Sequence, residues 1–225
     1  TINVSFQYMG SGVIGATSSS YVNNVNYSTS RTGLITGMDS DDSIQEWLPT
    51  GSSIPVRYNG SSTSVTNENK IDWTKASYKA TIGSTSGSVA SMSYNTGFTF
   101  DYDPSNGISG GTMSFVDVAI HEVGHALGFT SATDWGAYMT ALDLYRFQRT
   151  DGSDDYNPDT LEEFQTTPRL VDYNNPNDQH ISDLIDNEYR MSDGSPWQGS
   201  HFREQSSPWI GQMDPAFASG ESHYP

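Results

Sequence analysis

The chain has 225 residues, of which 34% are hydrophobic and 12% aromatic, so it can bury the core of one large domain and is not a wholly disordered protein. It has no cysteine, which excludes disulfides, thiolate metal sites and cysteine nucleophiles and leaves His, Asp and Glu as the strong metal ligands. The formal net charge of −17 argues against nucleic acid or an anionic membrane as a partner.

No stretch approaches the roughly 18 consecutive apolar residues that a membrane-spanning helix needs, so we expect no membrane insertion. No basic and then apolar leader opens the chain, so we expect the numbering to start in a mature or trimmed protein. After residue 115 lie 19 of the 27 acidic residues. This pattern is typical of a solvated acidic surface, and it leaves open that acidic loops hold Ca²⁺.

The first half of the chain predicts several strands. Residues 2–8 alternate apolar and polar side chains and predict a half-buried strand. Further strands are predicted over 53–58, 89–94 and 98–102, which are bounded by Gly and Asn turn signals. Between them, residues 66–82 have capping residues followed by apolar residues at helical spacing, which predicts a helix.

The clearest helix lies between Ser114, a good N-cap, and Gly128, a residue that typically ends helices. After it the chain is rich in Asp, Asn, Gly and Pro, apart from a short helix predicted over 181–191. Strands, one strong helix and an irregular remainder predict a single α+β domain over 1–225. We expect an N-terminal lobe over 1–128 and a C-terminal lobe over 129–225.

The strong helix carries the run His121-Glu122-Val123-Gly124-His125. The two histidines are four residues apart and lie on one face of a helix, where both can bind one Zn²⁺. Glu122 is turned by about 100°, so its carboxylate can reach a water beside the metal without binding the metal. Zinc lowers the pKa of such a water to about 7, and a carboxylate can take its proton and pass it to a leaving amine. The pattern predicts a zinc-dependent hydrolase of peptide bonds.

Two histidines leave Zn²⁺ short of the three protein ligands that catalytic zinc sites generally have. Ser131 is a poor third ligand, because a neutral hydroxyl binds zinc weakly beside imidazole. Asp134, Glu162, Glu163 and His201 are chemically acceptable. The residue types alone leave these four alternatives open.

Residues 121–129 resemble the active-site helix of the metzincin clan of zinc peptidases. Ser131 stands where most metzincins have their third ligand. In leishmanolysin-like metzincins the third histidine comes later, shortly before a methionine turn, and His201 followed by Met213 resembles that order. Pro215 stands where several metzincins have a tyrosine that contacts the zinc, so this role is not transferred.

The resemblance implies a metzincin-type zincin with a twisted mixed sheet and the active-site helix in the N-terminal lobe. It implies that His121, His125 and His201 hold Zn²⁺, with Glu122 as the general base. The C-terminal lobe would be irregular and carry the methionine turn, where Met213 forms a hydrophobic floor below the metal. The alternative for Met213 is an ordinary core methionine.

Residues 101–108 and 142–147 resemble a secreted bacterial branch of these proteins, and the absence of cysteine fits that branch. The resemblance therefore implies a secreted endopeptidase that acts on protein or peptide substrates, and we expect it to be a monomer. In metzincins an edge strand beside the active helix pairs with an extended substrate. Residues 89–94 are a candidate for this strand, and an interior strand is the alternative.

Other residues carry weaker signals. Asp117 is interpreted as a charge stabilised near a helix N-terminus, with a hydrogen bond to a metal ligand as the alternative. His180 and His223 are interpreted as solvent-exposed. Candidate Ca²⁺ ligands are Asp151, Asp154, Asp155 and Asp159, and then Asp39, Asp41 and Asp42.

A different class of function is a non-catalytic adhesion or glycan-binding module, which the Ser-, Thr- and Asn-rich first half would suit. Glu122 between two histidines favours an enzyme, because an adhesion module has no need of that arrangement.

Overall fold

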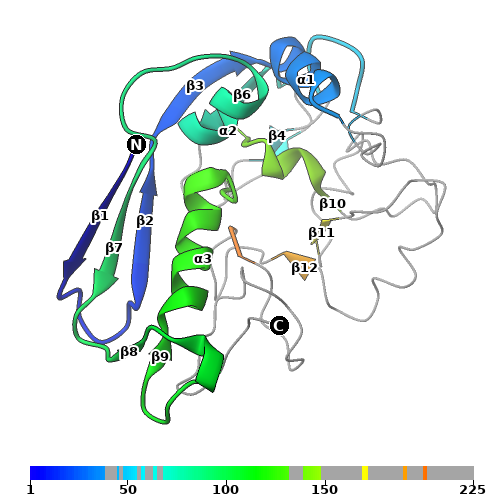
Figure 1. Ribbon diagram of the computed structural model, residues 1–225. Helices are drawn as coiled ribbons and strands as arrows, with labels where there is room; N and C mark the ends of the chain where they lie inside the picture. The colour runs from blue at the N-terminus through cyan, green and yellow to red at the C-terminus, as the bar shows by residue number, and fades with distance from the viewer. Residues whose placement is uncertain are drawn as a thin grey trace.

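The computed structural model describes residues 1–38, 45, 48–54, 57–58, 63–64, 68–131, 139–147, 169–171, 190–191 and 200–201. Within these residues it has a mixed three-stranded sheet, smaller sheets and three α-helices (Figure 1). The predicted α+β class is confirmed.

The three-stranded sheet lies beside the longest helix (Figure 1). It contains β1 (Ile2–Gln7), β2 (Gly15–Ser19) and β7 (Ala90–Asn95). β7 is in the middle, parallel to β1 and antiparallel to β2. The strands predicted over 2–8 and 89–94 are therefore confirmed. Because β7 is central, residues 89–94 are the interior strand and not an edge strand, and β2 is the edge strand on the helix side.

β1 is the opposite edge of this sheet, and its surroundings differ from the prediction. Val4, Phe6 and Tyr8 are 57%, 53% and 74% exposed. The strand itself is confirmed, but the prediction that one of its faces is buried is wrong. The physical reason is that the helix packs on β2 and β7 and leaves β1 largely uncovered.

A second, two-stranded sheet continues from the first. After β2 the chain enters β3 (Tyr21–Asn26), which pairs antiparallel with β6 (Lys70–Thr74). Helix α1 (Tyr27–Thr36) follows β3, and helix α2 (Lys75–Thr81) follows β6. These elements lie together at the top of the molecule in Figure 1.

The helix predicted over 66–82 is wrong in its first part, because residues 70–74 form strand β6. Every β6 residue after the first is buried. The residues of β6 do alternate polar and apolar side chains, but five residues directly before a helix are too few to separate this alternation from helical spacing. Trp73 is 2% exposed, and its Nε1 donates to the Ser30 hydroxyl at 2.8 Å. Thr74 then begins α2 by accepting a hydrogen bond from the backbone N–H of Ser77 at 3.2 Å.

Helix α3 (Phe115–Leu127) has the ends that the sequence predicts. The Ser114 hydroxyl accepts a hydrogen bond from the Asp117 N–H at 3.3 Å, so it is the N-cap. Gly128 ends the helix with φ 137° and ψ 4°, a conformation that side chains disfavour. Asp117 lies in the first turn of the helix, and its side chain is fully buried.

Two hydrophobic clusters hold these layers together. One lies between the β3–β6 pair and its helices and contains Tyr27, Leu48, Ile54, Ile71, Trp73, Met139 and Leu144. The other fixes α3 to the three-stranded sheet and contains Ala90, Met92, Tyr94, Val118 and Ala126. His121 and His125 are not members of this second cluster.

The remaining elements are short. They are β4 (Arg57–Tyr58), β5 (Thr63–Ser64), β8 (Phe100–Asp101), β9 (Met113–Ser114), β10 (Arg146–Phe147), β11 (Arg169–Val171), β12 (Arg190–Met191) and the 3₁₀ turns Pro104–Asn106 and Leu142–Tyr145. The strand predicted over 98–102 is shorter than expected, since β8 has two residues. Within the strand predicted over 53–58, Ile54 forms a bridge with Glu68 and β4 covers the last two residues, while residues 55 and 56 lie outside the described ones. The helix predicted over 181–191 is wrong at its end, where β12 lies; its other residues are outside the described ones.

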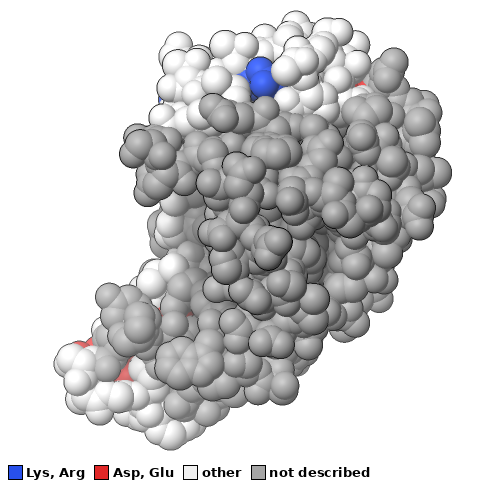
Figure 2. All heavy atoms as spheres, turned by 90° about the vertical axis from the view of Figure 1, so that its right-hand side faces the viewer, with Lys and Arg blue, Asp and Glu red and all other residues white. Residues whose placement is uncertain are grey.

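The described charges are sparse on the face in Figure 2. Basic atoms are visible near the α1 end, and acidic atoms near the β8–β9 end (Figure 2). Among the described residues, none of the helices has the length and apolar character needed to span a membrane.

Candidate metal centre

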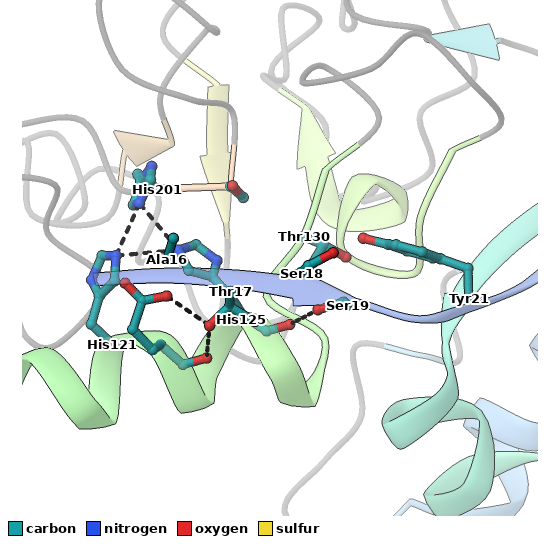
Figure 3. Close-up of a pocket in the computed structure, with 11 residues that line it drawn as sticks. Ala16, Thr17, Ser18, Ser19, Tyr21, His121, His125, Thr130 and His201 are labelled. Atoms are coloured by element: carbon teal, nitrogen blue, oxygen red, sulfur yellow. Dashed lines mark hydrogen bonds between the residues drawn. The ribbon is translucent and has the colours of Figure 1, made fainter. Parts of the chain in front are cut away.

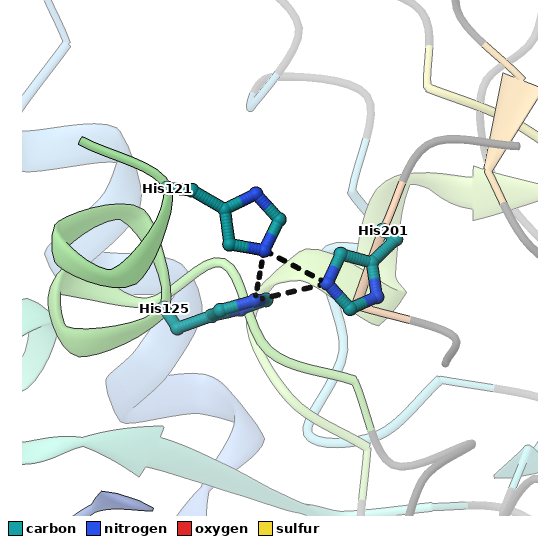
Figure 4. Close-up of side chains that lie close together, drawn as sticks. All are labelled: His121, His125 and His201. Carbon is teal, nitrogen blue, oxygen red and sulfur yellow. Dashed lines mark hydrogen bonds between the residues drawn. The ribbon is translucent and has the colours of Figure 1, made fainter. Parts of the chain in front are cut away.

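Three histidine side chains converge beside α3 (Figure 4). His121 and His125 lie one turn apart on the helix, and His201 comes from a segment 80 residues after His121. The Nε2 atom of His121 is 3.0 Å from that of His201. The Nε2 atom of His125 is 3.2 Å from each of the other two. The structure thus brings His201 to the helical pair.

The tautomer of His125 is determined by its second nitrogen. Nδ1 lies 2.8 Å from the carbonyl oxygen of Phe129, which has no proton, so Nδ1 must donate. A neutral His125 therefore presents the lone pair of Nε2 to the other histidines. Such a carbonyl partner is common behind metal-binding histidines, because it fixes both the ring orientation and the tautomer.

The turn after α3 places that carbonyl. The backbone N–H groups of Gly128 and Phe129 both donate to the Gly124 carbonyl, at 3.1 and 3.0 Å. Gly128 has φ 137°, and a Cβ atom there would lie 3.2 Å from Ser77 Cβ. The glycine thus lets the chain turn tightly against α2 and direct the Phe129 carbonyl back to His125.

The distances fit a tetrahedral metal ion. Zinc binds imidazole nitrogens at about 2.0–2.1 Å, so two such ligands are about 3.3 Å apart at a tetrahedral angle. The observed separations of 3.0–3.2 Å are close to this value. Three neutral Nε2 atoms cannot all satisfy one another by hydrogen bonds, because each has either one proton or one lone pair. A cation that accepts three lone pairs resolves the arrangement.

The histidines open into a pocket of about 410 Å³ (Figure 3). It is lined by Ala16, Thr17, Ser18, Ser19, Tyr21, His121, Glu122, His125, Thr130, Ser200 and His201. His121, Glu122 and His201 are only 6%, 5% and 8% exposed. Most of the other lining residues carry hydroxyl groups, and four come from strand β2.

Glu122 lies beside the histidines without joining their nitrogen cluster. Its Oε2 accepts a hydrogen bond from the Thr17 hydroxyl at 2.6 Å. Burial raises the pKa of the Glu122 carboxyl, and the hydrogen bond from Thr17 opposes this in part. A buried carboxylate with a raised pKa is suited to accept a proton at neutral pH.

Side-chain hydroxyl groups on two neighbouring strands donate hydrogen bonds to backbone carbonyls at the C-terminal end of α3. Ser19 donates to the His125 carbonyl at 2.9 Å, and Thr74 donates to the Leu127 carbonyl at 3.4 Å. Both carbonyls belong to the last turn, where intrahelical partners end. The histidine-bearing turn is therefore held by side-chain contacts as well as by the hydrophobic cluster.

Ser131, predicted from the sequence to be a poor zinc ligand, makes a different contact. Its hydroxyl donates to Asp143 Oδ1 at 2.6 Å, and both residues are fully buried. Asp143 also accepts the backbone N–H of Thr140 at 2.9 Å. These bonds join the segment after α3 to the turn at Leu142–Tyr145.

Several predicted site residues lie outside the described part of the chain. They are Met213, Pro215, the alternative ligands Asp134, Glu162 and Glu163, the histidines His180 and His223, and the Ca²⁺ candidates Asp39, Asp41, Asp42, Asp151, Asp154, Asp155 and Asp159.

Sequence reasoning missed the contribution of strand β2. Gly15, Thr17 and Ser19 alternate along it, and all three contact α3. The run has no alternation of apolar side chains, so only the two-residue spacing of a glycine and hydroxyl residues could have indicated a strand that faces a helix.

Comparisons with protein-family models, curated proteins and solved structures give no match.

Proposed function

We propose that the protein is a zinc-dependent endopeptidase, in which His121, His125 and His201 hold Zn²⁺ and Glu122 is the general base. The observation that carries this proposal is the convergence of three imidazole nitrogens within 3.2 Å of one another, with a buried carboxylate in the same pocket. Three neutral nitrogen donors and an open side are typical of catalytic zinc sites.

The residues of the chain have separate tasks in hydrolysis. A bound Zn²⁺ supplies Lewis acidity, which polarises the scissile carbonyl and lowers the pKa of a neighbouring water. Glu122 Oε2 is occupied by the Thr17 hydroxyl, whereas Oε1 accepts no hydrogen bond from the described residues. Oε1 therefore takes the proton of the attacking water and later gives it to the leaving amine. The pKa of Glu122, raised by burial, suits both transfers.

Strand β2 is suited to bind an extended peptide. It forms one wall of the pocket, and its second edge is unpaired among the described strands. A peptide that adds to this edge gains backbone hydrogen bonds and lies across the histidines. From the sequence, residues 89–94 are a candidate for this role, with an interior strand as the alternative; we propose β2 for it instead.

We further propose a metzincin-type fold of the leishmanolysin-like kind, with Met213 in the methionine turn. The resemblance of residues 121–129 and of the His201–Met213 order supports this. The same resemblance supports a secreted protein, and we propose that it is a monomer.

Hydrolysis of denatured casein by the purified protein tests the proposal. We expect hydrolysis that 1,10-phenanthroline abolishes and added Zn²⁺ restores. Glu122→Gln should keep one equivalent of zinc and lose at least about 100-fold in activity, the usual contribution of one acid–base group. Wild-type protein that binds zinc but cleaves no peptide, or a Glu122→Gln variant as active as wild type, would contradict the proposal.

A further inference from the structure

Two residues of strand β2 contact the side chain of Glu122, and pairing with a substrate would not need these contacts. Side chains two apart on a strand point to the same face, and Gly15, Thr17 and Ser19 all meet α3. Ser19 contacts only a backbone carbonyl, that of His125. Gly15 and Thr17 contact the Glu122 side chain itself.

Thr17 bonds two parts of Glu122. Its hydroxyl lies 2.6 Å from Oε2 of the carboxylate and 3.0 Å from the backbone carbonyl oxygen (Figure 3). The hydroxyl has one proton to donate, and both acceptors belong to Glu122. Thr17 therefore ties the side chain of this residue to its own helical backbone and to the strand.

Gly15 provides the space for this arrangement. A Cβ atom at position 15 would lie 2.6 Å from Glu122 Oε1, 3.0 Å from Cγ and 3.1 Å from Cδ. The backbone of Gly15 has an ordinary conformation, so the requirement for glycine comes from the carboxylate and not from the chain. Any larger residue must displace Glu122.

We propose that Thr17 and Gly15 are positioning residues for Glu122. Gly15 admits the carboxylate between strand and helix. Thr17 holds Oε2, which leaves Oε1 without a hydrogen bond from the described residues and available to the reaction. This inference rests on the proposed function, because it assigns the alignment of the general base. It predicts a loss in turnover without a loss of metal when either contact is removed.

The test compares Thr17→Val, which removes the hydroxyl, with Thr17→Ser, which keeps it. A hydrogen bond to a charged group justifies an expected fall in kcat of about tenfold or more for Thr17→Val, with KM within about twofold and zinc content unchanged. Thr17→Ser should retain kcat within about threefold of wild type. Thr32→Val is the matched control, since Thr32 donates to the Ser28 carbonyl of α1 at 2.8 Å, away from the pocket.

Crystal structures of the same variants give a readout that does not depend on activity. In Thr17→Val and in Gly15→Ala the Glu122 carboxylate should leave its wild-type position, whereas in Thr17→Ser it should stay. Gly15→Ala keeps the test decisive should Thr17→Val fold poorly. An unmoved carboxylate in Thr17→Val, a wild-type kcat for that variant, or a Thr17→Ser kcat as low as that of Thr17→Val would overturn the inference.

The two proposals fail in different ways. If the wild-type protein shows no zinc-dependent hydrolysis, the proposed function is wrong. In that case the carboxylate position in the variant crystal structures still shows whether Thr17 and Gly15 fix Glu122. A wild-type enzyme whose Thr17→Val variant is equally active removes only the positioning role.

Discussion

Replacing Gly128 by alanine should destabilise the protein and weaken metal binding together. Gly128 has φ 137°, where an L-residue is strained, at a cost of about 1–3 kcal/mol in the free energy of unfolding. The added Cβ would also lie 3.2 Å from Ser77 Cβ and 3.3 Å from Ser77 Oγ, so α2 must shift slightly. Both effects displace the turn that directs the Phe129 carbonyl to His125 Nδ1. Loss of such a partner lowers metal affinity by about 10- to 100-fold.

Two other glycines separate these contributions. Gly107 has φ 83° with no atom within 4 Å of its virtual Cβ, so Gly107→Ala reports backbone strain alone. Gly110 has neither constraint, so Gly110→Ala should change stability by no more than about 0.5 kcal/mol. Urea unfolding in EDTA measures stability, and competition with a chelator measures zinc affinity. A Gly128→Ala variant as stable as Gly110→Ala, with wild-type zinc affinity, would refute the reasoning.

Further predictions concern the helix cap, a buried carboxyl and the third ligand. Ser114→Ala should lower the unfolding free energy by about 1 kcal/mol, measured in urea, because the cap of α3 is lost; an unchanged value contradicts the cap. Burial raises the pKa of the Asp72 carboxyl above 3.8, although the hydrogen bond from the Asn24 N–H lowers it in part. The folded state therefore holds the proton more tightly than the unfolded state, so the free energy of unfolding falls as pH rises above 3.8. Asp72→Asn, which keeps the acceptor, should therefore gain stability relative to wild type between pH 4 and 7, and a constant difference across this range contradicts the assignment. His201→Ala should lose zinc on dialysis against a mild chelator, whereas Asp134→Ala should retain about one equivalent; the reverse outcome contradicts the ligand set.

The sequence predicts local structure well where the determinants are local. Helix α3 begins after Ser114 and ends at Gly128, because a cap, an apolar face and a stop residue all lie within one short run. Residues 70–74 differ from the predicted helix because their polar and apolar alternation covers only five residues and runs directly into α2. The pairing of β6 with β3, which is distant in the chain, decides the strand, and no local pattern encodes that pairing.

The residues of the metal centre also differ in how well the sequence alone predicts them. His121 and His125 are recognisable from their spacing alone, since one helix carries both. His201 is 80 residues from His121, and the residue types left it among four alternatives until the resemblance was considered. The contacts of Gly15 and Thr17 with Glu122 depend on the register of β2 against β7 and on the packing of α3, which no local pattern encodes.

An anomalous difference map recorded at the zinc absorption edge shows whether the three histidines bind zinc. We expect one strong peak about 2.0–2.1 Å from the Nε2 atoms of His121, His125 and His201, with Glu122 outside bonding distance. No peak in protein crystallised with zinc, or a peak bound by Glu122 or by Asp134 in place of His201, would contradict it.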